Sequence, residues 1–176
     1  MFSMVNIQEL QSRPVSEIGR ILGVNIPGYV PANLKQLGFA LEVSVLPYNF
    51  DALLRSGETL FAAFVTNKEG RSCIFYNSEL SEESSRIVVT KAFARYILTG
   101  NNSFYIMPST NLSEREKRLT YELLMPEDEV QDVLKQLILP TTLSLANIFY
   151  VTQEFVRERL DDIRPRLGRM IGGYDF

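Results

Sequence analysis

A long helix with its own start and stop signals constrains the fold of this chain more than any other feature. Ser81 is a residue type favoured at the N-cap of a helix, and Gly100 is typical of the position just beyond a helix end. The sequence therefore predicts one long helix from Ser81 to about Leu98. The other elements are expected to pack against it.

The segments before this helix predict a small antiparallel sheet. Residues 41–47 alternate between apolar and polar positions and end in a proline, which is typical of a strand. Residues 59–65 and 72–77 lie on either side of the turn residues 67–70, and this arrangement predicts a β-hairpin. We expect the sheet to pack on the long helix.

Helices are predicted on both sides of the sheet segments. Ser113 and Glu116 match a capping box for a helix through Leu124, and Pro126 opens another helix that Pro140 closes. Four shorter helices are expected at residues 15–22 (ending at Gly23), 32–40, 142–149 and 153–162. The order of helices, sheet and helices is that of an α+β fold.

Composition excludes several classes of function. The chain has 176 residues, of which 45% are hydrophobic and 22% charged, and this fits one soluble domain with a real core. A net charge of -3 provides no basic field for nucleic acid or anionic membranes. The chain contains no histidine and one cysteine, so imidazole catalysis, imidazole–zinc sites and an intrachain disulfide are all excluded.

Localisation is predicted from the N-terminus and from the length of the apolar runs. The opening residues MFSMVNIQEL lack the basic region and apolar stretch of a signal peptide. The longest apolar runs, such as residues 60–65, are too short to span a bilayer. We therefore expect a cytoplasmic protein with no membrane partner.

Three parts of the sequence carry a family resemblance: residues 86–98 (RIVVTKAFARYIL), 121–126 (YELLMP), and 145–152 with 156–160 (LANIFYVT and VRERL). In the same order they resemble the RFTLAHELGHYLL, AELLMP and LAxxFxVSxxxVxxRL segments of ImmA/IrrE-type metallopeptidases. Members of that family are cytoplasmic bacterial and phage zinc proteases that act on helix-turn-helix regulators. The resemblance extends from about Val15 to Leu160.

The resemblance implies a fold but not the family's chemistry. It implies a zincin-like minimal metallopeptidase fold over residues 1–139 and a helical, helix-turn-helix-like tail over 140–176. The family's catalytic helix has two histidines and a glutamate where this chain has Lys91, Arg95 and Ala92. Lysine and arginine are cations that offer no ready lone pair to zinc, and alanine is no general base. The resemblance thus implies an inactive member without metal or other cofactor.

A salt bridge is one hypothesis for what replaces the metal between the two motif helices. The family's third zinc ligand falls at or near Arg115, and the neighbours of Arg115 leave the register open between Glu114, Arg115 and Glu116. The bridge would join Lys91 or Arg95 to Glu114, Glu116 or Glu122. The alternative, in which both cations point into solvent, stays open.

The function implied by the resemblance is regulation by binding rather than by cleavage. The chain would be a pseudoprotease that binds a helix-turn-helix regulator of a mobile element or stress response in the cleft between hairpin and motif helix. Candidate contacts are Lys91 and Arg95, which would suit an acidic or C-terminal carboxylate group, and Phe61 and Phe75 on the hairpin 59–76, expected to act as a sheet edge.

DNA binding by the tail is the alternative function. Residues 142–160 resemble a helix-turn-helix unit, with Thr152 as the cap of its second helix. The candidate DNA contacts are Arg157, Arg159 and Arg164. From residue 157 to 169 five arginines outnumber three acids, a local charge of +2 on an acidic chain. Such a patch is more often a solvated face than a DNA reader, so this alternative is the less favoured one.

Carboxylate runs at two predicted helix starts have a simpler explanation than catalysis. Glu82-Glu83 and Glu127-Asp128-Glu129 lie in first helical turns, where the helix dipole favours negative charge.

Overall fold

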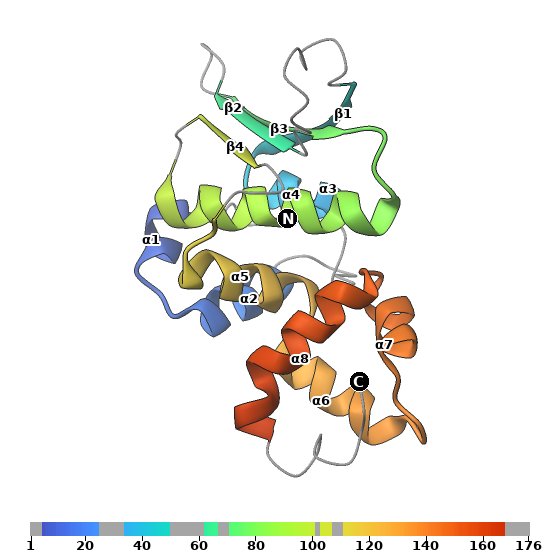
Figure 1. The fold of residues 1–176 in the computed structure, drawn as a ribbon. Coiled ribbons are helices and arrows are strands. Elements are labelled where there is room, and N and C mark those ends of the chain that lie inside the picture. The colour runs from blue at the N-terminus through green and yellow to red at the C-terminus, as the bar shows by residue number, and fades with distance from the viewer. Residues whose placement is uncertain are drawn as a thin grey trace.

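The structure is a computed structural model that describes residues 5–24, 34–49, 62–66, 71–100, 103–106 and 111–167. These residues form eight helices and four strands: α1 Ile7–Gln11, α2 Val15–Val24, α3 Leu34–Ala40, β1 Val43–Tyr48, β2 Ala62–Thr66, β3 Ser72–Asn77, α4 Glu82–Thr99, β4 Phe104–Ile106, α5 Glu114–Leu124, α6 Glu127–Gln136, α7 Thr142–Phe149 and α8 Gln153–Leu167. Figure 1 shows the sheet on one side of α4, with α2 and α5 on the other and α6, α7 and α8 grouped beyond them. The α+β fold class is confirmed.

The central helix α4 confirms the prediction of one long, capped helix. The Ser81 side chain accepts a hydrogen bond from the backbone N–H of Ser84, and the helix ends at Gly100. Gly100 has a φ of 86°, which glycine adopts without the strain that a side chain would introduce. Helix α4 is buried along most of its surface, with Val89, Phe93 and others fully inaccessible. It is therefore the element around which the fold is built.

The sheet is mixed, so the prediction of an antiparallel sheet is wrong for one of its pairs. The strand order is β1-β3-β2-β4. Strands β2 and β3 pair antiparallel and confirm the hairpin, whose turn residues 67–70 lie outside the described residues. Strand β1 runs parallel to β3, with Val43 opposite Ser72. Alternation within β1 indicates a strand, but pairing direction depends on packing with distant segments, which a local pattern does not encode.

Three elements near the N-terminus and the sheet differ from the sequence prediction. Helix α2 continues to Val24, past its predicted end at Gly23. Helix α1, capped by Asn6, and the three-residue strand β4 were not predicted.

Helix α3 packs so closely on β1 that a Cβ atom at Gly38 would lie 2.5 Å from the Val43 carbonyl oxygen. A glycine is needed at this crossing.

Two hydrophobic cores meet at α4 and α5. The first combines α1, α2, α3, the sheet and α4, together with Leu119 and Leu123 of α5. The second contains Ile87 of α4, Tyr121 and Leu124 of α5, and the buried faces of α6, α7 and α8. Helix α6 therefore shares its core with α7 and α8, although the sequence assigns it to the segment 1–139. The helical tail is packed into the rest of the fold.

Helix α8 extends beyond its predicted end at residue 162. It runs to Leu167 and contains Pro165, which lacks an N–H to donate to the carbonyl four residues earlier. Ile163 and Leu167 on this last stretch are buried in the second core, and their burial favours continuation of the helix.

Among the described residues, no helix has the length and apolar character needed to cross a membrane.

Candidate functional site

Helices α4 and α5 are joined by an ion pair where the family motif would hold its metal. Arg95 Nε donates to Glu116 Oε1 at 2.8 Å, and Arg95 Nη2 donates to the backbone carbonyl of Asn111 at 3.2 Å. The other oxygen of Glu116 accepts from the backbone N–H of Ser113 at 2.7 Å, which closes the predicted capping box. The same carboxylate thus starts α5 and fixes it to α4.

This ion pair is largely shielded from water. The side chain of Arg95 is 18% exposed and that of Glu116 is 7% exposed. Desolvation alone would raise the pKa of Glu116, but the hydrogen bonds from Arg95 and Ser113 outweigh it and hold the pKa below its ordinary value. Glu116 is therefore ionised at neutral pH, and the pair carries full charges.

The structure brings one of the candidate partners to the motif helix and directs the others elsewhere. Of the other two candidate carboxylates, Glu114 is exposed and makes no ion pair among the described residues, and Glu122 pairs with an arginine of α8. Arg115, the remaining residue of the open register, donates to the backbone carbonyls of Gln11 and Arg13. Glu116 is the carboxylate that reaches α4. The hypothesis of a salt bridge between the motif helices holds for Arg95 and Glu116. The alternative in which Arg95 points into solvent is wrong.

Lys91 lies one turn before Arg95 and has a different environment. It is half-buried, and no ion pair to Lys91 is present within the described part of the chain. It lines a cavity of about 250 Å³ between α4, α5 and α8, together with Asn111, Leu112, Glu114, Lys117, Thr120, Tyr121, Phe155 and Glu158. Of the two candidate contact residues, Lys91 lines this cavity, whereas Arg95 is paired with Glu116.

The position that the resemblance assigns to the family's catalytic glutamate is buried. Ala92 is 0% exposed and lies in the first hydrophobic core. A methyl group at this place neither accepts a proton nor orients a water molecule. A carboxylate in the same position would have to be buried among apolar side chains, at a large cost in free energy.

These residues do not fit a zinc ion. The two positions on α4 where the resemblance implies zinc ligands carry an ammonium and a guanidinium group, and the guanidinium already binds the carboxylate of Glu116. Within the described ranges no group of three or more histidine, cysteine, aspartate or glutamate side chains is placed to hold a metal ion. No step of hydrolysis can be derived for this site.

The hairpin is not the sheet edge that the sequence suggested. In the order β1-β3-β2-β4 both hairpin strands are internal, and the edges are β1 and β4. The hairpin strands are internal because β1 adds to one side and β4 to the other, pairings that no local pattern shows. Phe75 is half-buried on β3 and makes an edge-to-face contact with Tyr48 of β1, with ring centroids 6.0 Å apart. Phe61 lies outside the described residues.

The three arginines proposed for DNA contact have different surroundings. Arg157 and Arg164 are exposed, and Arg164 pairs with Asp161 at 3.4 Å. Arg159 is only 1% exposed, so it has no surface to offer to DNA and is removed from the candidates. Its burial follows from its place on α8, which turns it into the second core rather than toward solvent.

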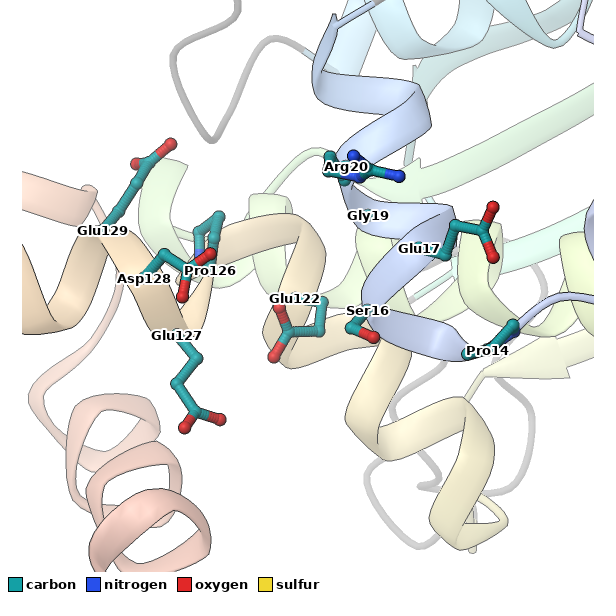
Figure 2. A pocket seen from close by; sticks show the side chains of 10 residues that line it. All are labelled: Pro14, Ser16, Glu17, Gly19, Arg20, Glu122, Pro126, Glu127, Asp128 and Glu129. Atoms are coloured by element: carbon teal, nitrogen blue, oxygen red, sulfur yellow. The ribbon is translucent and has the colours of Figure 1, made fainter. Parts of the chain in front are cut away.

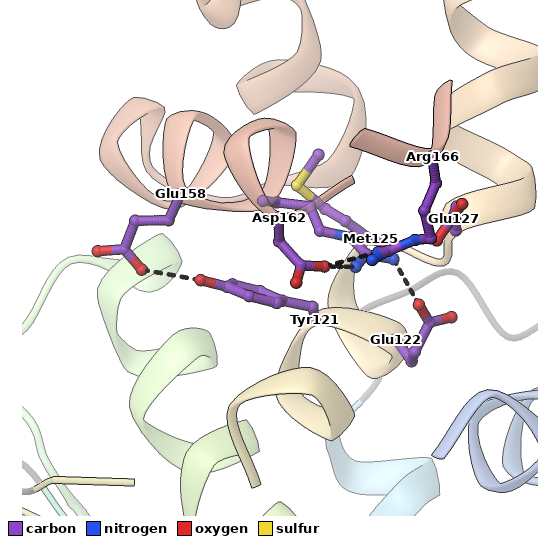
Figure 3. A network of polar contacts seen from close by, with 8 residues as sticks. Tyr121, Glu122, Met125, Glu127, Glu158, Asp162 and Arg166 are labelled. Atoms are coloured by element: carbon purple, nitrogen blue, oxygen red, sulfur yellow. Dashed lines mark hydrogen bonds and ion pairs between the residues drawn. The ribbon is translucent and has the colours of Figure 1, made fainter. Parts of the chain in front are cut away.

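Arg159 instead organises a polar network beneath α8. Figure 3 labels other members of this network: Glu122, Met125, Glu127, Asp162 and Arg166. Arg159 forms ion pairs with Glu122 of α5 and Asp162 of α8 and donates from Nε to the Met125 carbonyl at 3.0 Å. Arg166 joins the same network through Asp162 and Glu127, both at 2.9 Å. The network fixes α8 to the end of α5.

Sequence reasoning missed this role of Arg159. Arg159 belongs to the VRERL segment, which resembles a segment of the family. That resemblance is the signal in the sequence that could indicate a structural role for this arginine. A count of charges alone does not separate Arg159 from the exposed arginines of the tail.

Comparison with known proteins identifies the family. The peptidase M78 family, described as the IrrE N-terminal-like domain, matches residues 54–161. No match was found among curated proteins or solved structures. The matched residues include α4, α5 and the ion pair between them. They span more than half of the chain, which therefore belongs to the IrrE N-terminal-like domain family.

Proposed function

We propose that this chain is a catalytically inactive member of its family that binds a helix-turn-helix regulator of a mobile element or stress response and controls it by occupancy. The observation that carries the proposal is the ion pair between Arg95 and Glu116. It stands where the family motif has its second histidine, and it holds α4 and α5 together without a metal.

The chemistry of the three motif positions supports the absence of hydrolysis. Zinc hydrolysis requires lone-pair donors for the metal and a base for the attacking water. Lys91 and Arg95 are cationic, and Ala92 is buried without a polar group. Nothing in this triad performs either task, so the remaining use of the cleft is binding.

The cavity next to Lys91 is the surface where the partner would bind. Arg95 has its charge neutralised by Glu116, so an acidic side chain or a C-terminal carboxylate of the partner would pair with Lys91. The half-buried Phe75 belongs to the sheet that covers the opposite side of α4. We therefore assign the main contact to Lys91 and not to the hairpin.

Binding and cleavage can be separated in one experiment. The chain is used as bait in a two-hybrid screen against the helix-turn-helix regulators of its source genome, and a regulator that binds is purified. The regulator is then incubated with the chain with and without added zinc, and its mass is measured. The proposal predicts a stable complex and an intact regulator in both conditions.

A matched pair of charge reversals tests the surface. Lys91→Glu is expected to abolish the complex, whereas Lys135→Glu, on the exposed side of α6, is expected to leave it unchanged. Zinc-dependent fragments of the regulator would show that the chain is an enzyme. A complex that survives Lys91→Glu would show that the partner binds elsewhere.

A further inference from the structure

The turn between α6 and α7 carries the two most exposed large hydrophobic side chains of the described residues. Ile138 is 92% exposed and Leu139 is 79% exposed, and Leu143 and Ile148 of α7 follow at 54% and 47%. Together with Asn147, which is also exposed, these residues are called the outer face of α7. Single exposed hydrophobic residues are ordinary, but four within residues 138–148 mark a contact surface.

The backbone of this turn is held by the residues on either side of the exposed pair. Leu137 packs against the second hydrophobic core, and Pro140 is buried. Ile138 and Leu139 lie between these two anchors and are directed outward. Figure 1 shows α7 at the outer side of the group formed by α6, α7 and α8. The exposure of the pair is thus built into the fold of the described residues.

The same part of the chain carries no charge. Residues 136–153 contain no aspartate, glutamate, lysine or arginine, although 22% of the whole chain is charged. Exposed surfaces of monomeric proteins normally mix charged residues of both signs. An exposed face that is both apolar and uncharged is typical of a surface that another protein covers.

Another hollowed surface of the chain has the opposite character. Figure 2 shows the groove between α2 and the start of α6, and its lining includes five carboxylates and one guanidinium. Two copies of the chain that met through this groove would bring like charges together. The outer face of α7 has no such obstacle, because a neutral surface is not repelled by its own copy.

We infer that the outer face of α7 joins two copies of this chain around a two-fold axis. In such a dimer each residue of the face meets the same face of the second copy, so the surface must be complementary to itself. Asn147 satisfies this condition, because its amide both donates and accepts hydrogen bonds and can pair with Asn147 of the second copy. The aliphatic side chains on either side of it leave water in the contact.

The size of the face agrees with this occupant. At about 180 Å² for a fully exposed leucine or isoleucine, the four aliphatic residues expose about 500 Å². The uncharged and exposed Gln136, Thr141 and Asn147 extend the face toward the value of about 800 Å² that one partner buries in a standard interface. The inference uses none of the motif residues, so it is independent of the proposed function.

The first test measures the molar mass of the purified full chain by sedimentation equilibrium, between about 1 and 100 µM. The mass is expected to rise from 20.1 kDa toward twice this value as the concentration increases. The variant Ile138→Ser/Leu139→Ser should weaken this association about a hundredfold, because two apolar side chains no longer leave water. Phe39→Ser, the matched control, removes an exposed hydrophobic side chain of α3 and should associate like the wild type.

The second test uses the symmetry of the contact. Asn147→Asp and Asn147→Lys each place two like charges beside the two-fold axis, so each variant alone is expected to remain at the mass of one chain. An equimolar mixture of the two variants brings opposite charges together and is expected to recover the mass of two chains. Circular dichroism confirms that all variants are folded.

Three results would overturn the inference. A wild-type mass of 20.1 kDa at every concentration would show that the face is not covered by a second copy and is left to an unlike partner. A dimer that Ile138→Ser/Leu139→Ser does not weaken would show that the copies meet elsewhere. A mixture of the two Asn147 variants that associates no better than either variant alone would exclude a two-fold axis beside this residue.

Discussion

Arg95 and Glu116 form an ion pair of 2.8 Å between α4 and α5, and the two residues are separated by 21 positions in the chain. Glu116 is at the same time the N3 residue of the capping box that starts α5. The start of one helix is thus set by a contact with another. The resemblance implies that zinc links the corresponding helices in active members of the family, and we propose that the pair takes over this structural task here.

The first prediction concerns the strength of this pair. Arg95→Gln is expected to destabilise the fold by about 2 kcal/mol, because it leaves the Glu116 carboxylate shielded from water without its cation. In a double-mutant cycle with Glu116→Gln, urea unfolding should give a coupling energy of about 1–3 kcal/mol. Lys91→Gln on the same helix removes a cation that has no ion-pair partner among the described residues, so it should change stability by less than about 0.5 kcal/mol.

Additivity of Arg95→Gln and Glu116→Gln would contradict this prediction. It would mean that each side chain acts through other contacts, such as the one between Arg95 and the Asn111 carbonyl.

The second prediction is a pH dependence of stability that arises from Glu116. The pKa of Glu116 lies below its ordinary value of 4.5 in the folded chain. The ionised carboxylate therefore stabilises the fold fully above the pKa of the unfolded chain, and this contribution is lost as the pH falls through the lower, folded-state pKa. Wild type should exceed Glu116→Gln in unfolding free energy at about pH 7, and the difference should shrink toward about pH 3.

Urea titrations at several pH values measure this difference directly. A difference that stays constant, or grows, as the pH falls would contradict the assignment of a lowered pKa to Glu116.

Local signals explain which parts of the fold the sequence predicts. The caps at Ser81 and Ser113 and the glycine at Gly100 act within one helical turn, and the structure confirms each of them. The hairpin strands also follow from a local pattern. The parallel pairing of β1 with β3 depends on segments about thirty residues apart, and no feature of residues 43–48 specifies it.

The sequence likewise predicts the residues of the candidate site but not which of them pair. The motif positions Lys91, Ala92 and Arg95 are visible in the sequence, and so is the set of carboxylates from which Glu116 is chosen. The choice itself depends on how α5 is rotated against α4, which tertiary packing decides. Burial of Arg159 depends likewise on the docking of α8, so a charge count along the chain does not reveal it.

The third prediction compares two arginines of α8. Arg159→Ala is expected to destabilise the fold by about 3–5 kcal/mol, because Glu122 and Asp162 lose their shared buried cation. Arg157→Ala, two residues earlier on the exposed side, is expected to cost less than about 0.5 kcal/mol. Thermal unfolding of the two variants beside the wild type measures both effects.

Similar melting temperatures for the two arginine variants would contradict the central role of Arg159. They would imply that α8 is held to α5 by hydrophobic packing alone, through residues such as Leu160 and Ile163.

The most direct test of the central claim is the zinc content of the purified chain, measured by elemental analysis together with its melting temperature with and without a chelator. The account predicts far less than one zinc per chain and no effect of the chelator, because the two positions on α4 where the resemblance implies zinc ligands carry the cationic side chains of Lys91 and Arg95. The variant Lys91→His/Ala92→Glu/Arg95→His, prepared in parallel, restores the donor types of the family motif beside Glu116 and is expected to take up zinc. Stoichiometric zinc in the wild-type chain, with a lower melting temperature in chelator, would contradict the account.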